Sequence, residues 1–218
     1  WPGKLATVYG HINESASGNS VTAKTPQAVL SMLTLPHQFF PPMPMTTPHS
    51  EENTSLVDHF LIAMPQLQDS YFANSVIYLW RHNDEGALGL VINLPLKIEL
   101  HEILEQLQLT DQRPATADQT VLSGGPVEAE KGFVLHDDAP RWPSSMLIKE
   151  GLTLTTSREI LADIARGEGP KNYLLALGCS GWSPGQLEKE LKENAWLTCP
   201  ATKDIIFSRD FSGKPAMA

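Results

Sequence analysis

The most constraining feature of this sequence is a short apolar run that leads into two glycines and then into a helix start. Residues 174–177 (LLAL) have the length of a buried strand, and Gly178 and Gly181 permit backbone angles that a side chain would forbid. Ser183 stands where an N-cap belongs, and Gln186 follows at the spacing of a capping box. The stretch predicts a strand, a tight glycine turn and a helix, a junction where α/β proteins often bind ligands.

Composition limits the classes of protein to which the chain can belong. With 218 residues, 41% of them hydrophobic, it can bury a sizeable core, and no apolar run approaches the length of a membrane span. The net charge of −9 argues against direct nucleic-acid binding, which needs clustered Lys and Arg. Cys179 and Cys199 form no Cys-x-x-Cys motif and fit a reducing compartment, so we expect the cytoplasm.

The first part of the chain differs from the rest. Seven of the 17 prolines lie in residues 1–50, among scattered Ser and Thr. Residues 39–44 (FFPPMP) cannot form a helix, because proline removes amide donors and holds the preceding residue extended. We expect residues 1–54 to be a disordered or non-native leader with the true start at Met45, and residues 55–218 to form a single domain.

Apolar patterns predict both strands and helices from residue 56 onward. Residues 75–82 and 87–93 are apolar on both faces and are joined by a four-residue turn, so this hairpin should lie inside a sheet covered on two sides. A stripe of leucine and isoleucine at helical spacing predicts a helix over residues 100–107. Capping-box spacing at residues 156–159 precedes a second helix that ends at Gly167.

Together with the remaining predicted elements, these helices and strands predict an α+β fold. A third helix is expected from Pro184 to about Asn194, and the polar residues 111–119 predict a loop. Further strands are expected at residues 60–64, 120–122, 132–135, 151–155 and 204–207.

Several blocks of this region, in order, resemble the AlgH/YqgE family of bacterial proteins. The resemblance covers roughly residues 56–207. The blocks include residues 60–65 (FLIAMP), 86–93 (GALGLVIN), 124–127 (GGPV), 132–136 (GFVLH), 152–157 (LTLTTS), 185–188 (GQLE) and 194–197 (NAWL). Family members usually continue beyond the position of Phe207, so the resemblance implies a chain truncated at its C-terminus.

The resemblance implies a fold rather than a reaction. The family's fold is a curled, largely antiparallel sheet with helices packed on it. No established activity and no cofactor come with the family. One branch is named as a regulator of alginate production, which implies an indirect role in regulating gene expression.

Cys179 is the candidate for redox or nucleophilic chemistry. It follows the predicted strand and precedes the helix start, where amides and the helix dipole would stabilise a thiolate. A small buried residue is the commoner role, and relatives often carry Tyr at this position.

A histidine pair is the other candidate for chemistry. His82 and His136 end two predicted strands beside acidic turns, and they could hold a metal if those strands were neighbours. The sequence shows no metal-ligand spacing, so we predict no metal site.

The glycine-rich turns are the candidate binding surface. The turn from Ser123 to Pro126, which contains Gly124 and Gly125, could present backbone amides to a small anion, and so could the helix start at Ser183, which follows the segment from Gly178 to Trp182. If the two turns lie side by side, they form an anion pocket that Asn93 and His136 could line, together with Gly181.

Two hypotheses from different classes follow. The favoured one is a non-enzymatic binding or regulatory protein that presents these turns and Trp182 to a partner protein or a small anionic ligand. The alternative is an enzyme or redox sensor that uses Cys179 or the pair of His82 and His136.

Overall fold

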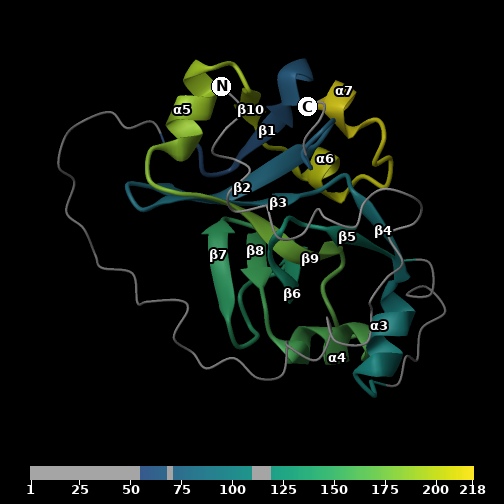
Figure 1. Cartoon of the computed structure of the whole chain (residues 1–218). Helices are drawn as coiled ribbons and strands as arrows, with labels where there is room; N and C mark the ends of the chain where they lie inside the picture. Colours follow the sequence, from purple (N-terminus) through teal and green to yellow (C-terminus); the bar gives the residue numbers. More distant parts are fainter. Residues whose placement is uncertain (1–54, 68–70, 110–118) are drawn as a thin grey trace, which may run out of the picture.

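The structure is a computed structural model that describes residues 55–67, 71–109 and 119–218 (Figure 1). The predicted leader, residues 1–54, lies outside these ranges, as does the predicted loop 111–119 except for Gln119. The strands are β1 (His59–Ala63), β2 (Val76–Asn83), β3 (Gly86–Val91), β4 (Pro95–Glu99), β5 (Thr120–Ser123), β6 (Val127–His136), β7 (Ser145–Lys149), β8 (Leu152–Thr155), β9 (Tyr173–Trp182) and β10 (Trp196–Pro200). The helices are α3 (Leu100–Gln106), α4 (Arg158–Arg166), α5 (Gln186–Lys192), α6 (Lys203–Phe207), α7 (Lys214–Met217) and the short 3-10 helix η3 (Pro65–Leu67).

The described strands form a curled sheet of ten strands. The main path runs β10-β1-β2-β3-β9-β6-β8-β7, and the remaining pairs are β4 with β5 and β5 with β9. Among the strands that the structure describes, only β5 and β9 form a parallel pair. Lys149 at the end of β7 forms an ion pair with Asp58 beside β1, so the sheet curls until its two ends approach. The predicted α+β class with a curled, largely antiparallel sheet is confirmed.

The predicted hairpin lies inside this sheet, with a tighter turn than the sequence indicated. β2 lies between β1 and β3, and β3 lies between β2 and β9. Asn83 and Gly86 are already paired, so the loop is Asp84-Glu85 rather than four residues. Gly86 adopts a φ of 118°, which favours glycine at the end of so short a loop.

β9 is the strand on which the rest of the sheet is organised. Its first half pairs with β5 and β6, and its second half pairs with β3. Gly178 lies where the partners change and has a left-handed φ of 72°. The predicted tight glycine turn is therefore a kink within one continuous strand, because hydrogen bonding continues on both sides of Gly178.

Both faces of the sheet are buried. One apolar cluster fills the inside of the curled sheet and includes Ile206 of α6. In a second cluster, α3 and α4 pack on the outer face of β5, β6 and β9. A third places Leu187 of α5 on the outer face of β1 to β3. Figure 1 shows α3 and α4 near one end of the molecule and α5, α6 and α7 at the other. No described helix is long and apolar enough to span a bilayer.

The helices differ from expectation mainly at their starts. α5 begins at Gln186 with Gly185 as N-cap, and only one half of the predicted capping box forms, from the Ser183 amide to Gln186 Oε1 at 3.0 Å. α4 begins after Ser157, whose side chain makes no capping bond, and ends at left-handed Gly167 as predicted. The prediction of a capping box at residues 156–159 is therefore wrong.

One predicted strand is a helix, and three strands were not predicted. Residues 204–207 belong to α6, where the amide of Ile206 bonds to the carbonyl of Thr202 at 3.0 Å. The sequence patterns did not predict β4, β7 or β10.

Candidate functional site

The two glycine turns lie against each other, backbone to backbone. The Gly124 amide donates to the Leu177 carbonyl at 2.8 Å, and the Gly124 carbonyl accepts from the Val91 amide at 2.8 Å. A Cβ on Gly124 would lie 2.3 Å from the Gly178 carbonyl oxygen, and one on Gly125 would lie 2.2 Å from the carbonyl carbon of Cys179. These glycines allow the two segments to approach, so the space expected to hold an anion is filled by protein backbone.

Asn93 and His136 do not line a common pocket with these turns. Asn93 Oδ1 accepts from the Val76 amide at 2.8 Å, and its Nδ2 donates to the Asn74 carbonyl at 2.9 Å, so both ends of the amide hold the start of β2. His136 ends β6 opposite Tyr173, whereas the glycine turn precedes the other end of β6. His136 therefore lies apart from the turns, whereas Asn93 adjoins them through its neighbour Leu94, whose carbonyl accepts from the Ser123 amide, but uses its side-chain amide within the protein. The predicted pocket lined by both residues is not formed.

Trp182 is an interior residue, contrary to the prediction of an exposed contact. It is 6% exposed and stacks on Phe72 with ring centroids 6.4 Å apart. Its indole N–H donates to Glu190 Oε2 at 2.9 Å, and the Trp196 indole donates to the same oxygen at 2.8 Å. One carboxylate of α5 thus satisfies two buried indoles and fixes the helix over β9 and β10.

Cys179 lacks the environment of a reactive thiol. Its side chain is 3% exposed within β9, and burial raises its pKa to about 12, with a further contribution from Glu128. The prediction of a stabilised thiolate fails because β9 continues past Cys179, and the helix starts seven residues later at Gln186.

His82 is fully engaged in local structure. Its Nδ1 accepts from the Leu56 amide at 3.0 Å, so the ring proton lies on Nε2, which is 2.7 Å from Glu188 Oε1. β3 and β9 separate β2, which carries His82, from β6, which carries His136. The histidine pair is therefore not brought together, and the described residues contain no group of three or more His, Cys, Asp or Glu placed to hold a metal.

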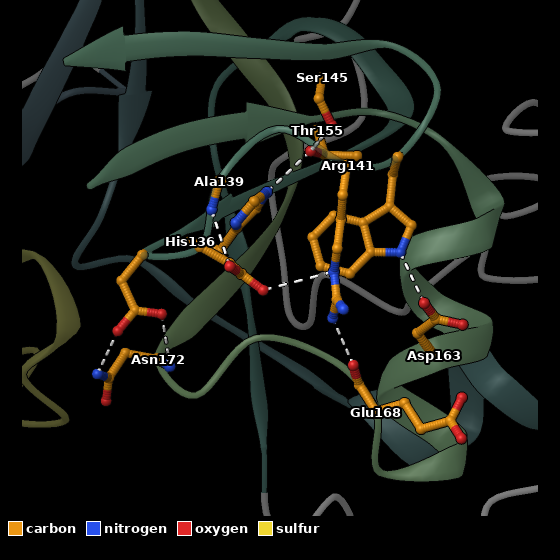
Figure 2. Close-up of polar contacts among 11 residues, drawn as sticks. His136, Ala139, Arg141, Ser145, Thr155, Asp163, Glu168 and Asn172 are labelled. Carbon is orange, nitrogen blue, oxygen red and sulfur yellow. Dashed lines mark hydrogen bonds and ion pairs between the residues drawn. The ribbon is translucent and has the colours of Figure 1, made fainter. Parts of the chain in front are cut away.

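His136 belongs to a buried polar relay on β6, β7 and β8 (Figure 2). Its Nε2 lies 2.8 Å from Thr155 Oγ1, which in turn lies 2.6 Å from Ser145 Oγ. The ring is fully buried and packs edge-on against Trp142, with centroids 5.2 Å apart. Burial lowers the pKa of His136 to about 4, although the carboxylates nearby act in the opposite direction. These hydrogen bonds hold a neutral imidazole between the strands. Because the ring is fully buried, a substrate cannot reach it.

Apolar side chains are exposed around the glycine turn. Tyr71 is 41%, Leu94 38% and Val127 42% exposed. The Tyr71 hydroxyl is hydrogen-bonded to Ser123 Oγ, and the Ser123 amide donates to the Leu94 carbonyl at 2.8 Å, so both residues adjoin the turn. We define the glycine-turn surface as Tyr71, Leu94, Pro126, Val127 and the exposed Gly181.

The sequence predicts the centre of this surface but not its exposed apolar side chains. Gly181, Pro126 and the glycines beneath them were among the predicted residues. Tyr71, Leu94 and Val127 were missed, because single apolar residues in short segments do not indicate which face they occupy. A basic pocket beside α6 and α7 was missed as well, since its lining comes from three separate segments.

Comparison with known proteins places the chain in a family. The AlgH-like family model matches residues 60–214. A UPF0301 protein of Stenotrophomonas maltophilia is 51% identical over 154 residues, which cover 71% of this chain and 82% of the relative, and one of Nitrosospira multiformis is 46% identical over 72% and 84%. The solution structure of the AlgH protein from Pseudomonas aeruginosa superposes with a TM-score of 0.65 at 43% identity and covers 78% of this chain and 89% of that one. The chain is a member of the AlgH-like family.

Proposed function

We propose that this protein is a non-enzymatic binding protein of the bacterial cytoplasm, and that it binds a partner protein through the glycine-turn surface. The observation that carries the proposal is the exposure of Tyr71, Leu94 and Val127 around one rigid turn. Exposed apolar groups that gather on a monomer mark interaction sites, and tyrosine is enriched among residues that dominate binding energy.

The framework beneath this surface supports the proposal. The interlocked Gly124, Gly125 and Gly178 hold the turn in one conformation, since any side chain there would collide with backbone. A rigid surface loses little conformational entropy on binding, and more of the contact energy therefore appears as affinity. The net charge of −9 favours a basic partner through electrostatic steering.

Other features favour a binding role over a catalytic one, and a cytoplasmic location. Cys179 and His136 are both buried, so neither predicted reactive group meets a substrate. Cys179 and Cys199 are free thiols, as is usual in a reducing compartment. Under this proposal, an effect on gene expression is exercised through the partner protein rather than by contact with DNA.

A matched pair of surface variants tests the proposal. Val127→Arg places a charge at the centre of the glycine-turn surface, whereas Leu197→Arg makes the same change on β10 at a site that is 56% exposed. Immobilised wild-type protein and Leu197→Arg should retain the same companion from an extract of the source bacterium, and Val127→Arg should not. Equal retention by both variants, or no companion for the wild type, would contradict the proposal.

A further inference from the structure

A basic pocket lies beside the C-terminal helices, and none of its lining residues belongs to the glycine-turn surface. Its volume is about 200 Å³, and its walls come from β5, the start of β9 and the segment that runs from α6 to α7. In Figure 1, α6 and α7 lie in the upper part of the view, at the opposite end from α3 and α4.

The charges of this pocket have one sign. Lys171 and Arg209 are exposed at its rim, Lys214 is fully buried in its wall, and none of the described Asp or Glu residues contributes to the lining. Among described residues, no carboxylate lies within ion-pair distance of any of these three cations. This is notable in a chain with 25 acidic and 16 basic residues.

The three cations play different parts. Lys214 Nζ donates to the carbonyls of Ile92 at 2.8 Å and Ile206 at 2.9 Å and lies 5.2 Å from the centroid of the Phe211 ring, so its described partners are neutral groups and none is a carboxylate. Because Lys214 is not exposed, it acts on the pocket through its field. The Arg209 guanidinium is oriented by Gln119 Oε1 at 3.2 Å, and Arg209 and Lys171 remain able to contact a ligand.

The rest of the lining is partly aromatic, which limits the class of ligand. Tyr173, Phe207 and Phe211 line the pocket beside the cations. An enclosed cavity of about 150 Å³ accommodates a benzene molecule. A pocket of this size with an aromatic wall therefore suits an apolar group of that order with a charged substituent.

We propose that this pocket binds a small phosphate monoester whose apolar group is about the size of a benzene ring. A phosphate monoester carries close to two negative charges at neutral pH, and the fork of an arginine matches its oxygens in a bidentate geometry. A carboxylate offers only one charge to the same three cations.

Titration calorimetry with phenyl phosphate tests the proposal directly. The wild-type protein should bind it, and the double variant Lys171→Gln/Arg209→Gln should bind at least about tenfold more weakly, because each lost charged hydrogen bond has an effect of that order. The double variant Lys189→Gln/Lys192→Gln, which removes two positive charges at exposed positions of α5, serves as the control and should bind as the wild type does. Urea unfolding midpoints confirm that all variants are folded.

Further probes separate the contributions of charge and ring. Inorganic phosphate and benzoate should both bind more weakly than phenyl phosphate, and vesicles that contain phosphatidic acid should not bind. The proposal is overturned if phenyl phosphate fails to bind at millimolar concentration, or if the double variant binds as the wild type does. It is also overturned if inorganic phosphate binds equally well, or if the vesicles bind.

Discussion

At the scale of single residues, position within a strand decides what each candidate group can do. Cys179 and His136 carry reactive chemistry in many proteins, but here each lies in the middle or at the end of a covered strand. Burial raises the pKa of the Cys179 thiol and lowers that of the His136 imidazole, because it disfavours the charged form of each. Both groups therefore remain neutral near pH 7.

Thiol labelling tests the account of Cys179. In the folded protein, 5,5′-dithiobis(2-nitrobenzoate) should modify Cys179 no faster than the chain unfolds, because the thiol is 3% exposed and its pKa is raised to about 12. In concentrated urea, Cys179 and Cys199 should both react at once. Labelling of Cys179 in the native protein within seconds would restore the redox hypothesis.

Gly125→Ala tests whether close backbone approach explains the glycine turn. A Cβ there would meet the carbonyl of Cys179 at 2.2 Å, and the residue has a φ of 150°, so we expect a loss of about 3 kcal/mol of unfolding free energy. Gly185→Ala is the control, since φ is 73° and nothing lies within 4 Å of its Cβ, and it should cost only about 1 kcal/mol. Equal losses in urea unfolding would refute the packing explanation.

The pH dependence of stability tests the burial of His136. Its folded-state pKa of about 4 lies below the unfolded value of about 6.5, so between these values the unfolded chain binds the additional proton. Stability should therefore fall as pH falls from about 6.5 to 4, with at most about 3 kcal/mol from this residue. In His136→Gln this contribution disappears, and the slope of unfolding free energy against pH should be shallower by up to one proton. Identical slopes would mean that His136 titrates normally.

At the scale of elements, one carboxylate helps to hold α5 on the sheet, in addition to the packing of Leu187 and the contact of Glu188 with His82. Glu190 Oε2 accepts from the indoles of Trp182 and Trp196, while Oε1 accepts from Gln186 Nε2 at 3.0 Å. The two tryptophans are 6% and 5% exposed, so their N–H groups have no ready alternative in water. Packing of α5 on the sheet therefore depends on this residue.

Glu190→Ala should lower the free energy of unfolding by about 2–4 kcal/mol, because two buried donors lose their acceptor. Glu193→Ala, at the exposed C-cap of the same helix, should cost less than about 0.5 kcal/mol. Urea unfolding followed by tryptophan fluorescence measures both. Equal effects of the two substitutions would show that the shared carboxylate contributes nothing beyond ordinary helix stability.

Elements with a periodic apolar pattern or a marking glycine could be predicted from the sequence. Short segments without such a pattern could not. α3 was predicted because four apolar residues recur along one face, and the hairpin of β2 and β3 because two long apolar runs flank a turn. α6 was misread as a strand because its apolar residues, Ile205 to Phe207, are consecutive and show no period. Strands as short as β10 are held by their pairing with β1, which is a long-range property.

The candidate site was predictable only in part, for the same reason. The sequence indicates where glycines permit unusual backbone, and the Gly124 and Gly178 segments do meet. It does not indicate what fills the space beside them, so Trp182 and His136 were assigned to a surface that they do not reach. The exposed side chains of that surface depend on tertiary packing.

At the scale of the whole molecule, a binding surface and a pocket are formed by different residues. The glycine-turn surface is apolar and rigid, whereas the basic pocket beside α6 and α7 combines cations with aromatic side chains. Binding of a small anion and binding of a partner protein would then take place at different parts of the same curled sheet. The two proposals stand on different residues, and failure of one leaves the other intact.

The central claim is that the glycine-turn surface contacts a partner protein, and site-specific photocrosslinking in living cells tests it most directly. A photoreactive phenylalanine analogue replaces Tyr71 or Val127 in separate strains, and Leu197 in a control strain. The same protein adduct should form from the first two positions, and no such adduct should form from Leu197. Absence of an adduct at both turn positions, or the same adduct from Leu197, would contradict it.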